Sequence, residues 1–387
     1  MLEQWCLDPR VTYLNHGTVG ATPRRVLGAQ QALREEMERQ PSQFMLRELA
    51  GHVGLTPPAP TRMRAAATVV AGFVGSRGED IAFVDNATTG ANAVLRSFEF
   101  QAGDEILVTD HGYGAVTCAA QYVARQRGCT VRVVELPYPV PAPGAIVAAI
   151  EAAIGPRTRM AIVDHVSSGS AVVLPIAEVA ALCRSRGVAL LVDGAHAPGA
   201  LGLDIPSIGA DWYTGNLHKW AWAPRSCGLL WAAPGRQAGL HPTVISWGLD
   251  QGFTTEFDWV GTRDPSSWLA APEAIAMLGD LGALAVRDYD HSLAIEAVHR
   301  LRDSIGAEVM APDAMIGTMA TVVLPARFGA TTEDASRLRD LLLMRDGIEV
   351  EIHAWKERVR VRVSAQVYNE TADIDRLVLA LESSCPA

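Results

Sequence analysis

The chain has 387 residues, 49% of them hydrophobic, and its 33 basic and 43 acidic residues give a formal net charge of -10. This length can bury one large core and a smaller one, so two lobes are expected rather than a single domain. The acidic balance and the lack of a basic run argue against a nucleic-acid partner, and no apolar run reaches the roughly 20 residues of a membrane span.

The six cysteines are scattered, with neither C-x-x-C pairs nor the spacing of metal ligands. We therefore expect no metal site and predict that the cysteines are reduced and buried. The N-terminus has no basic stretch followed by an apolar one, so no export signal is predicted. Both features are typical of a cytoplasmic protein.

An amphipathic helix is predicted from Val26 to Arg39, and seven later runs that are apolar and rich in β-branched residues are predicted to be strands. Helix-like segments alternate with these strands. The sequence therefore predicts an α/β lobe with a seven-stranded, mostly parallel sheet that helices cover on both faces. The predicted strands begin at Ile81, Glu105, Val131, Met160, Ala189, Trp212 and Gly228.

A helix is predicted to start directly after the first of these strands, at Ala87-Thr-Thr-Gly-Ala-Asn92. Backbone N–H groups and hydroxyls at a helix N-terminus point outward and can hold a phosphate dianion. Thr88 and Thr89 are therefore candidate phosphate ligands, with the alternative that one of them only caps the helix. No G-x-x-x-x-G-K motif occurs, so this is not a P-loop.

The strongest signal for chemistry lies at the ends of two neighbouring predicted strands. Ala189-Leu-Leu-Val-Asp193 brings a carboxylate to the edge where open α/β sheets bind ligands, and His218-Lys219 comes directly after the next strand. Lys219 is one of only two lysines, and it lies in an apolar, tryptophan-rich segment. Burial there lowers the pKa of an amine and makes it a usable nucleophile. We predict that Lys219 is catalytic, rather than a surface lysine on a loop.

After Trp259-Val-Gly-Thr-Arg-Asp264 the pattern turns helical, and strands then alternate with a helix. This predicts a smaller α+β lobe and three parts: an N-terminal segment (1–25), a large domain (26–260) and a small domain (261–387). Arg263 either binds a substrate carboxylate or pairs with Asp264 or Asp258.

Arg362 lies on the last predicted strand, Val359-Arg-Val-Arg-Val-Ser364. A guanidinium fork meets a carboxylate with two parallel hydrogen bonds, so Arg362 is a candidate for binding an anionic group. The alternative is an alternating strand that turns Arg360 and Arg362 to solvent.

The motifs Asp193-Gly-Ala-His196 and Asn216-Leu-His218-Lys219 resemble those of the class V aminotransferases, a family of fold type I pyridoxal-phosphate enzymes that includes the cysteine desulfurases. Asn15-His-Gly17, Gly261-Thr-Arg-Asp264 and Ser364-Ala-Gln-Val-Tyr-Asn369 are most similar to the isopenicillin N epimerase-like branch. The likeness covers the whole chain. It implies the cofactor pyridoxal 5'-phosphate and a homodimer with shared active sites.

For the cofactor, the resemblance implies that Lys219 holds it covalently, as an internal aldimine. Asp193 is expected to pair with the pyridinium nitrogen, which keeps the ring able to accept electrons. His196 belongs to the same cofactor-binding motif as Asp193. Asn216 and His218, three residues and one residue before the lysine, are expected to help bind the phosphate.

Three further cofactor contacts are implied by the resemblance. Tyr113, in the turn His111-Gly-Tyr-Gly114, is expected to stack on the pyridine face, or else it only fills the turn. Ser168 stands where desulfurases have an asparagine that contacts the phenolic oxygen, and serine has a shorter reach. Thr262 is expected to reach the phosphate of the neighbouring subunit's cofactor.

For the substrate, the resemblance implies that Arg362 binds the α-carboxylate and that the segment with Asn15 and His16 reaches the active site. The alternative for Asn15 and His16 is turn chemistry alone. Lys219 is expected to remove the Cα proton. An epimerase also needs a second acid, for which Tyr113, His111 and His16 are candidates.

The expected function is that of an amino-acid epimerase or racemase, and the alternatives are a carbon-sulfur β-lyase of a cysteine conjugate, an aminotransferase or an oxidative decarboxylase. Glu351–Arg358, expected as a loop between two C-terminal strands, contains no cysteine, so a cysteine desulfurase is not expected. A DNA-binding regulator would need an appended basic domain, and a nicotinamide dehydrogenase would need a G-x-G-x-x-G motif; the sequence has neither.

Overall fold

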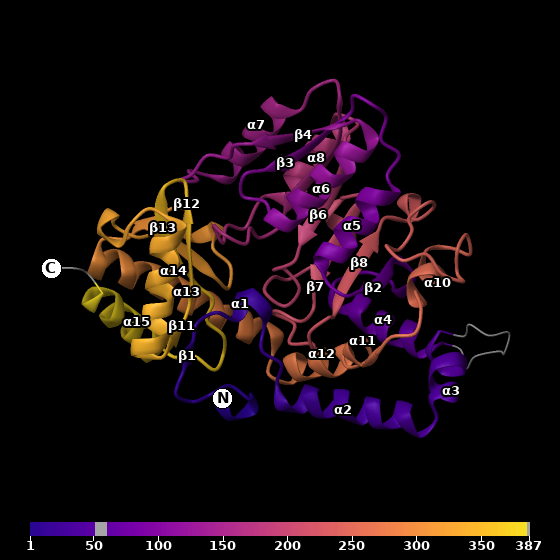
Figure 1. Cartoon of the computed structure of the whole chain (residues 1–387), viewed down its shortest axis with the longest axis horizontal. Coiled ribbons are helices and arrows are strands. Elements are labelled where there is room, and N and C mark those ends of the chain that lie inside the picture. The colour runs from indigo at the N-terminus through magenta and orange to yellow at the C-terminus, as the bar shows by residue number, and fades with distance from the viewer. Residues whose placement is uncertain (51–59, 385–387) are drawn as a thin grey trace.

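A seven-stranded sheet forms the core of the larger lobe in the computed structural model, which describes residues 1–50 and 60–384 (Figure 1). Its order is β2-β8-β7-β6-β5-β3-β4, and only β8 runs antiparallel to its neighbours. The predicted seven-stranded, mostly parallel sheet is therefore confirmed. The strands are β2 (Ile81–Val84), β3 (Glu105–Thr109), β4 (Thr130–Val134), β5 (Thr158–Asp164), β6 (Ala189–Gly194), β7 (Trp212–Asn216) and β8 (Gly228–Ala232).

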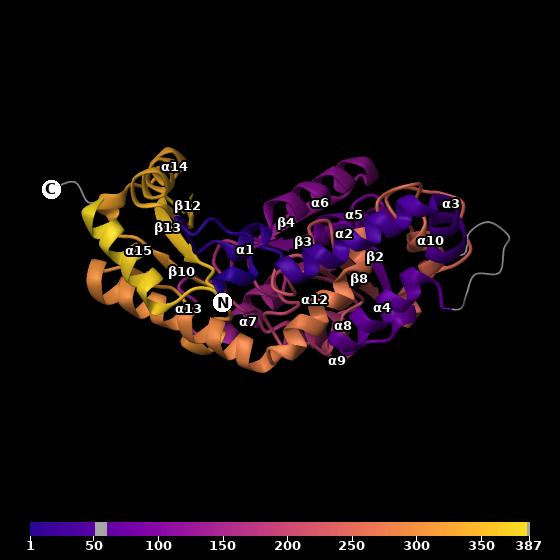
Figure 2. The ribbon, with the colours of Figure 1, turned by 90° about the horizontal axis from the view of Figure 1, so that it is seen from below.

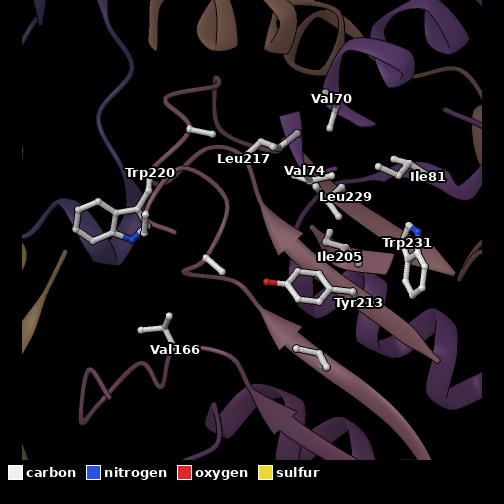
Figure 3. Packing of buried hydrophobic residues seen from close by; sticks show 14 of the residues in the cluster. Val70, Val74, Ile81, Val166, Ile205, Tyr213, Leu217, Trp220, Leu229 and Trp231 are labelled. Carbon is white, nitrogen blue, oxygen red and sulfur yellow. The ribbon is translucent and has the colours of Figure 1, made fainter. Parts of the chain in front are cut away.

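Both faces of this sheet are buried because its central strands are apolar on both sides. Tyr213 on β7 and Leu229 and Trp231 on β8 face one core (Figure 3), whereas Trp212 and Leu230 face the other. Full burial of one such side chain stabilises the fold by about 1.5–3 kcal/mol. The first core contains α4 (Arg62–Phe73), α7 (Pro143–Ala153), α8 (Ile176–Ser185), α9 (Ile205–Ile208) and α12 (Ala271–Asp280), and the second contains α5 (Ala87–Ser97), α6 (Gly114–Arg127) and α10 (Phe253–Asp258).

The smaller lobe is built on an antiparallel sheet of order β12-β13-β10-β9 (Figure 1). The hydrophobic core of this lobe, the third in the molecule, packs the sheet against three helices. The strands are β9 (Glu308–Val309), β10 (Ala320–Val323), β12 (Glu351–Trp355) and β13 (Arg358–Val363), and the helices are α13 (Ala283–Ile305), α14 (Thr332–Leu341) and α15 (Thr371–Ser383).

The expectation of a loop at Glu351–Arg358 is wrong. This stretch is a β-hairpin in which β12 pairs with β13 along its whole length, from Glu351 opposite Arg362 to Trp355 opposite Arg358. Only Lys356 and Glu357 form the turn, both with positive φ (48° and 54°). A two-residue turn of this kind matches the twist of the strands and leaves no free loop.

The N-terminal segment lies against the smaller lobe. β1 (Thr12–Tyr13) pairs with β11 (Ile348–Glu349), α1 (His16–Val19) follows, and α2 (Arg24–Arg39) runs beside α12 (Figure 2). The domain boundaries stay predictions, although α12 packs in the large core and α13 is the first long helix that packs against the smaller sheet. Two further α-helices in the described chain are α3 (Pro41–Gln43) and α11 (Ser266–Leu269), and π-helical turns lie at Phe44–Leu49 and Leu342–Asp346.

Five of the cysteines lie in the described part of the chain, and all five are free. Cys183 and Cys227 are buried, as expected. The prediction of burial is wrong for Cys6 and Cys118, which are exposed, because neither lies on a side of its segment that faces a core. Cys385 lies outside the described residues.

Within residues 1–50 and 60–384, no single helix has both the length and the apolar composition that crossing a bilayer requires. Ser266–Asp280 and Ala283–Ile305 satisfy that test only as a pair, and they are bent by 77° relative to each other.

Candidate active site

The carboxyl ends of three adjacent parallel strands place polar side chains at one edge of the large sheet. β5 ends at Asp164, β6 carries Asp193 directly beside it, and β7 ends at Asn216. His218 and Lys219 lie in the turn that follows β7. Ligands bind at this edge in open α/β sheets because the strand ends and helix N-termini meet there. The structure therefore brings together the residues that the sequence singled out.

Lys219 is buried, and its amine contacts a neutral partner rather than an acid. Its Nζ lies 3.1 Å from Nε2 of His196. No carboxylate in the described chain forms an ion pair with it. Burial, and after it the charge of Arg362, lowers the pKa of Lys219 to about 7, against the opposing effect of Asp193 and Asp164. Much of this amine is therefore unprotonated at neutral pH and can act as a nucleophile.

Asp193 presents one carboxylate oxygen that has no partner. Oδ1 accepts a hydrogen bond from the Ala195 N–H at 3.0 Å, whereas Oδ2 is buried without a partner among the described residues. Burial raises the pKa of Asp193. An unpaired buried acceptor is costly, and a cationic ring N–H would satisfy both the oxygen and the charge. Asp193 therefore fits the pyridinium partner that a pyridoxal phosphate needs.

Asp164 is a site residue that the sequence reasoning missed. It lies opposite Asp193 across the β5–β6 ladder, and burial together with the Asp193 charge raises its pKa well above the ordinary value. The sequence pattern could have identified Asp164, because this residue ends an apolar strand just as Asp193 does. A protonated Asp164 leaves Asp193 as the ionised member of the pair.

The N-terminus of α5 lies beside Asn216. Its cap is Asn86, whose Oδ1 accepts hydrogen bonds from the N–H (2.9 Å) and the hydroxyl (3.2 Å) of Thr89. The alternative that Thr88 or Thr89 caps the helix is therefore wrong. Asn216 Oδ1 accepts the Ala87 N–H at 2.8 Å, so β7 and α5 are held together. The Thr88 hydroxyl has no partner in the described chain, which leaves it available to an anion.

His218 supports the turn that carries the lysine. Its Nδ1 lies 3.0 Å from the carbonyl oxygen of Cys227, at the start of β8. Burial lowers the pKa of His218 to about 4, so the ring is neutral at physiological pH. The expected phosphate contact of His218 therefore stays a prediction, with Nε2 as the atom that remains for it.

Arg362 reaches from the smaller lobe into the site and is only 3% exposed. The alternative that Arg360 and Arg362 face solvent is therefore wrong. Nη1 donates to the backbone oxygen of Ser168 at 2.7 Å and to its hydroxyl at 3.3 Å. Nη2 donates to Thr18 Oγ1 at 2.6 Å, and Nε has no partner in the described residues. Because none of these partners is an anion, Arg362 retains the capacity to bind a carboxylate.

Ser168 and Asn15, two residues predicted to contact the cofactor or the substrate, already form hydrogen bonds within the protein. The Ser168 hydroxyl already accepts from Arg362, so its expected contact with the cofactor would share that oxygen. Asn15 Nδ2 donates to Glu349 at 3.0 Å, and its Oδ1 lies 3.5 Å from Arg362 Nη2. Thr18 was missed, because no sequence signal places it beside a residue 344 positions later.

A cavity of about 280 Å³ opens next to Arg362, between two turns of the large lobe and the β12–β13 hairpin. Its lining is Asp110, His111, Gly112, Tyr113, Gly114, Ser168, Gly169, Ser170, His353, Ala354 and Trp355. Tyr113 is 45% exposed at this cavity, whereas His111 is buried with Nδ1 2.7 Å from Ser170 Oγ. The stacking role of Tyr113 and the acid role of His111 stay predictions.

A model of the family described as aminotransferase class-V matches residues 20–377. The chain belongs to this family. It is 34% identical to isopenicillin N epimerase of Streptomyces clavuligerus over 395 residues, which cover 97% of this chain and 96% of that protein. It is 30% identical to L-cysteine desulfhydrase of Arabidopsis thaliana over 404 residues, which cover 95% of this chain and 86% of that protein.

Among solved structures, the cysteine desulfurase of Thermococcus onnurineus NA1 matches with a TM-score of 0.81 at 19% identity, over 99% of this chain and 96% of that one. This likeness confirms the fold of a type I pyridoxal-phosphate enzyme. It partly conflicts with the expectation that the chain is not a cysteine desulfurase, but at this identity it shows the fold alone. As a class V aminotransferase, the chain is a pyridoxal-phosphate-dependent enzyme.

His16 connects three parts of this class V enzyme. Its Nδ1 lies 2.9 Å from the Tyr368 hydroxyl, and its Nε2 lies 3.1 Å from the backbone oxygen of Lys219. The ring is fully buried, and burial lowers its pKa to about 4. Both ring nitrogens are thus engaged, which favours a positioning role over the expected substrate contact. We call Tyr368, His16 and the Lys219 carbonyl the His16 latch.

Tyr368→Phe is expected to destabilise the protein by about 1–3 kcal/mol, because it leaves a buried His16 nitrogen without a partner. Urea denaturation of the cofactor-free protein measures this change. Tyr289→Phe is the matched control: its hydroxyl donates to the Asn369 carbonyl at 2.7 Å, but the side chain is 41% exposed, so water replaces the lost partner. Equal losses in both variants would contradict the latch.

The segment that links the lobes holds two further predicted residues. Thr262 is exposed, and its contact with a neighbouring subunit's cofactor stays a prediction. Arg263 pairs with Asp85 at 3.4 Å and lies 3.9 Å over the ring of Trp268. The expected pairing with Asp264 or Asp258 is wrong, because Arg34 and Arg64 bind those two carboxylates. A substrate contact by Arg263 stays a prediction.

Proposed function

We propose that this enzyme is a carbon-sulfur β-lyase that acts on a small, cysteine-type amino acid. The observation that carries the proposal is the cavity of about 280 Å³ beside Arg362, whose lining contains no cysteine. This volume lies at the lower limit of ligand sites and suits a short side chain better than a peptide substituent. The order of the two leading expectations from the sequence is thereby reversed.

The residues assigned to the cofactor fall into three groups. Lys219 would bind the aldehyde group, Asp193 would pair with the ring nitrogen, and His196 would lie beside Lys219, whose Nζ is 3.1 Å from its Nε2. Tyr113 and Ser168 would border the ring. The phosphate would lie against the N-terminus of α5, near Thr88, Thr89, Asn216 and His218. When bound, pyridoxal phosphate withdraws electrons from the substrate's Cα.

The chain's own residues bind and orient the amino acid. Arg362, whose Nε has no partner in the described residues and whose terminal nitrogens contact only neutral oxygens, would hold the α-carboxylate, which fixes how the Cα–H bond points. The Lys219 amine, with its lowered pKa, would accept the Cα proton. His196, 3.1 Å from Nζ, keeps that amine in place.

Elimination then needs one bond to break at Cβ. As the Cα proton moves to Lys219, a Cα–Cβ double bond forms, the Cβ–S bond breaks, and its electron pair leaves with the sulfur. The sulfur takes up a proton and departs as a thiol or as sulfide. The unsaturated amine that remains takes up water and yields pyruvate and ammonia. No oxidant or reductant is consumed.

A desulfurase would instead transfer the sulfur to a cysteine of the protein. In this chain the stretch expected to carry that cysteine is the β12–β13 hairpin, which has none and has only a two-residue turn. A sulfur-accepting thiolate must move between the substrate and the surface, and a fully paired hairpin does not provide that motion. These features support the proposal that persulfide transfer is not the reaction.

Incubation with L-cysteine in deuterated water is expected to give sulfide, pyruvate and ammonia in equal amounts, without any amino acceptor. Sulfide and pyruvate assays together with NMR of the amino acid measure the outcome. Alanine and a protein-bound persulfide would indicate a desulfurase and contradict the proposal. Recovery of the D-enantiomer with deuterium at Cα would indicate an epimerase, and keto acid only with an acceptor would indicate an aminotransferase.

Epimerisation is the second candidate, and the 34% identity to isopenicillin N epimerase over nearly the whole chain favours it. It requires a proton donor on the side of Cα opposite Lys219. Tyr113 and His111, both at the cavity, are the residues that could supply one. His16 is less suited, because both of its ring nitrogens are engaged in the His16 latch.

We further infer that two copies of the chain assemble with shared active sites. Thr262 is exposed, and an apolar group precedes it that includes Val244, Ile245 and Trp247, of which Trp247 is 79% exposed. Such a group on a surface is typical of an interface. A partner that covers it would bring the neighbouring Thr262 toward the other site.

A further inference from the structure

His353 lines the cavity beside Arg362, and its ring has no hydrogen-bond partner among the residues that the structure describes. It belongs to β12, where Glu351, His353 and Trp355 share one face, while Ile352 and Ala354 point into or toward the core of the smaller lobe. The alternation of a strand thus turns His353 toward the large lobe. A Cβ atom added to Gly169 would lie 3.5 Å from His353 Nε2, an ordinary contact distance, so the ring lies directly beside this turn of the large lobe.

The ring of His353 is neutral and its surroundings are cationic. Burial, and after it the charges of Arg362 and Arg360, lowers its pKa to about 4. A neutral imidazole has one N–H donor and one acceptor nitrogen. The acid that lines the cavity, Asp110, is paired with Lys356 at 2.9 Å. The donor of His353 therefore lacks an acceptor in the described chain, and the nearby charges favour an acceptor that is negative.

The strand register relates His353 to the carboxylate site. Arg362 lies opposite Glu351 and Arg360 lies opposite His353, so His353 and Arg362 are diagonal neighbours on the same face. Such neighbours are about 7–8 Å apart along the sheet, within reach of the two ends of one amino acid held between their side chains. A substrate whose α-carboxylate binds Arg362 can therefore extend its β-substituent toward His353.

We propose that His353 is a specificity-determining residue that donates a hydrogen bond to the γ-atom of the substrate. It selects amino acids whose γ-atom is an acceptor, namely a sulfur that leaves as a thiolate or an oxygen in its place. This inference rests on the proposed function, because it takes Arg362 as the carboxylate site. The hydrogen bond also stabilises the charge that develops on sulfur when the Cβ–S bond breaks.

The test compares L-serine, which has a γ-acceptor but a poor leaving group, with L-alanine, which has none. Binding to the loaded enzyme is followed by the absorbance of the cofactor. The unmodified enzyme is expected to bind L-serine about tenfold more tightly than L-alanine, as one hydrogen bond to a neutral donor allows. His353→Leu is expected to remove this preference and to leave L-alanine binding within about twofold.

Two further variants separate a local role from general damage. His353→Asn keeps a donor and is expected to retain part of the preference for L-serine. His299→Asn, on the outer side of α13, replaces a histidine far from the cavity and is expected to leave both affinities unchanged. If His353→Leu weakens both amino acids equally, or neither, the inference is overturned.

A second readout needs no cofactor. In the cofactor-free protein with labelled histidine, the NMR signal that His353→Leu removes is expected to shift with L-serine and not with L-alanine. Equal shifts, or no shift, overturn the inference whatever the enzyme does. The two proposals can fail separately. If the His353 signal responds to L-serine but the enzyme releases no pyruvate from any cysteine-type amino acid, the role of His353 is retained and the proposed function is overturned.

Discussion

Lys219→Ala abolishes covalent attachment of the cofactor and lowers turnover by about 10³-fold or more, because one amine serves as both anchor and base. The chain offers a matched control, since Lys356 is its only other lysine. Lys356 forms ion pairs with Asp110 at 2.9 Å and Glu135 at 3.0 Å, and its hydrogen bonds to these acids raise its pKa in spite of partial burial. Lys356→Ala is therefore expected to retain attachment.

The pH dependence of attachment distinguishes the two lysines further. An amine attacks an aldehyde only in its unprotonated form, so the rate of attachment to the cofactor-free protein rises with pH and reaches half of its plateau near 7. An ordinary lysine amine would place this midpoint near 10.5. Stopped-flow absorbance measures the rate, and borohydride reduction with peptide mapping locates the label. A label on Lys356, or a midpoint near 10, would contradict the assignment.

Asp193→Asn is expected to have opposite effects on stability and turnover. The cofactor-free wild-type protein carries a buried carboxylate with an unpartnered oxygen beside a second carboxyl, Asp164. A neutral amide removes that charge and is expected to stabilise the cofactor-free protein by about 1–3 kcal/mol at pH 8. In the loaded enzyme, loss of the anion that faces the ring nitrogen is expected to lower turnover by about 10²–10³-fold.

The stability effect has a defined dependence on pH. Burial raises the pKa of Asp193 above its ordinary value of 3.8. Between pH 3.8 and the raised pKa, the folded protein therefore binds more protons at this residue than the unfolded protein does. Stability is therefore expected to fall as pH rises from 3.8 toward the raised pKa, and the substitution is expected to flatten this fall. Urea denaturation of the wild-type protein and of Asp193→Asn at pH 5 and pH 8 measures the fall in stability and how far the substitution flattens it.

Asp164→Asn is the matched control for Asp193. It replaces the neighbouring carboxyl of the same pair, which is already protonated, so its gain in stability is expected to be smaller than that of Asp193→Asn. It leaves the anion at Asp193, so its turnover is expected to stay within about tenfold of the wild-type value. If both substitutions reduce turnover equally, Asp193 has no special relation to the cofactor ring and the assignment is wrong.

Local patterns in the sequence determined much of the fold. The apolar run ending at Asp193 predicted a buried parallel strand, because a strand covered on both faces needs apolar residues at every position, and Trp212–Asn216 was predicted as the next strand. The same patterns placed Lys219 next to these strand ends. The pairing of a strand-end carboxylate with a buried lysine is a short-range signal, since both residues follow adjacent strands in order along the chain.

Only the tertiary structure decided which distant residues meet. The contact between Arg362 and Thr18 joins residues 344 positions apart, and the adjacency of Asp164 and Asp193 depends on strand order. The position of His353 in the cavity depends on the β12–β13 hairpin, which the sequence suggested as a loop, and on the packing of that hairpin next to Gly169. Periodicity specifies which face of a strand is buried, but the packing of two lobes specifies what that face meets.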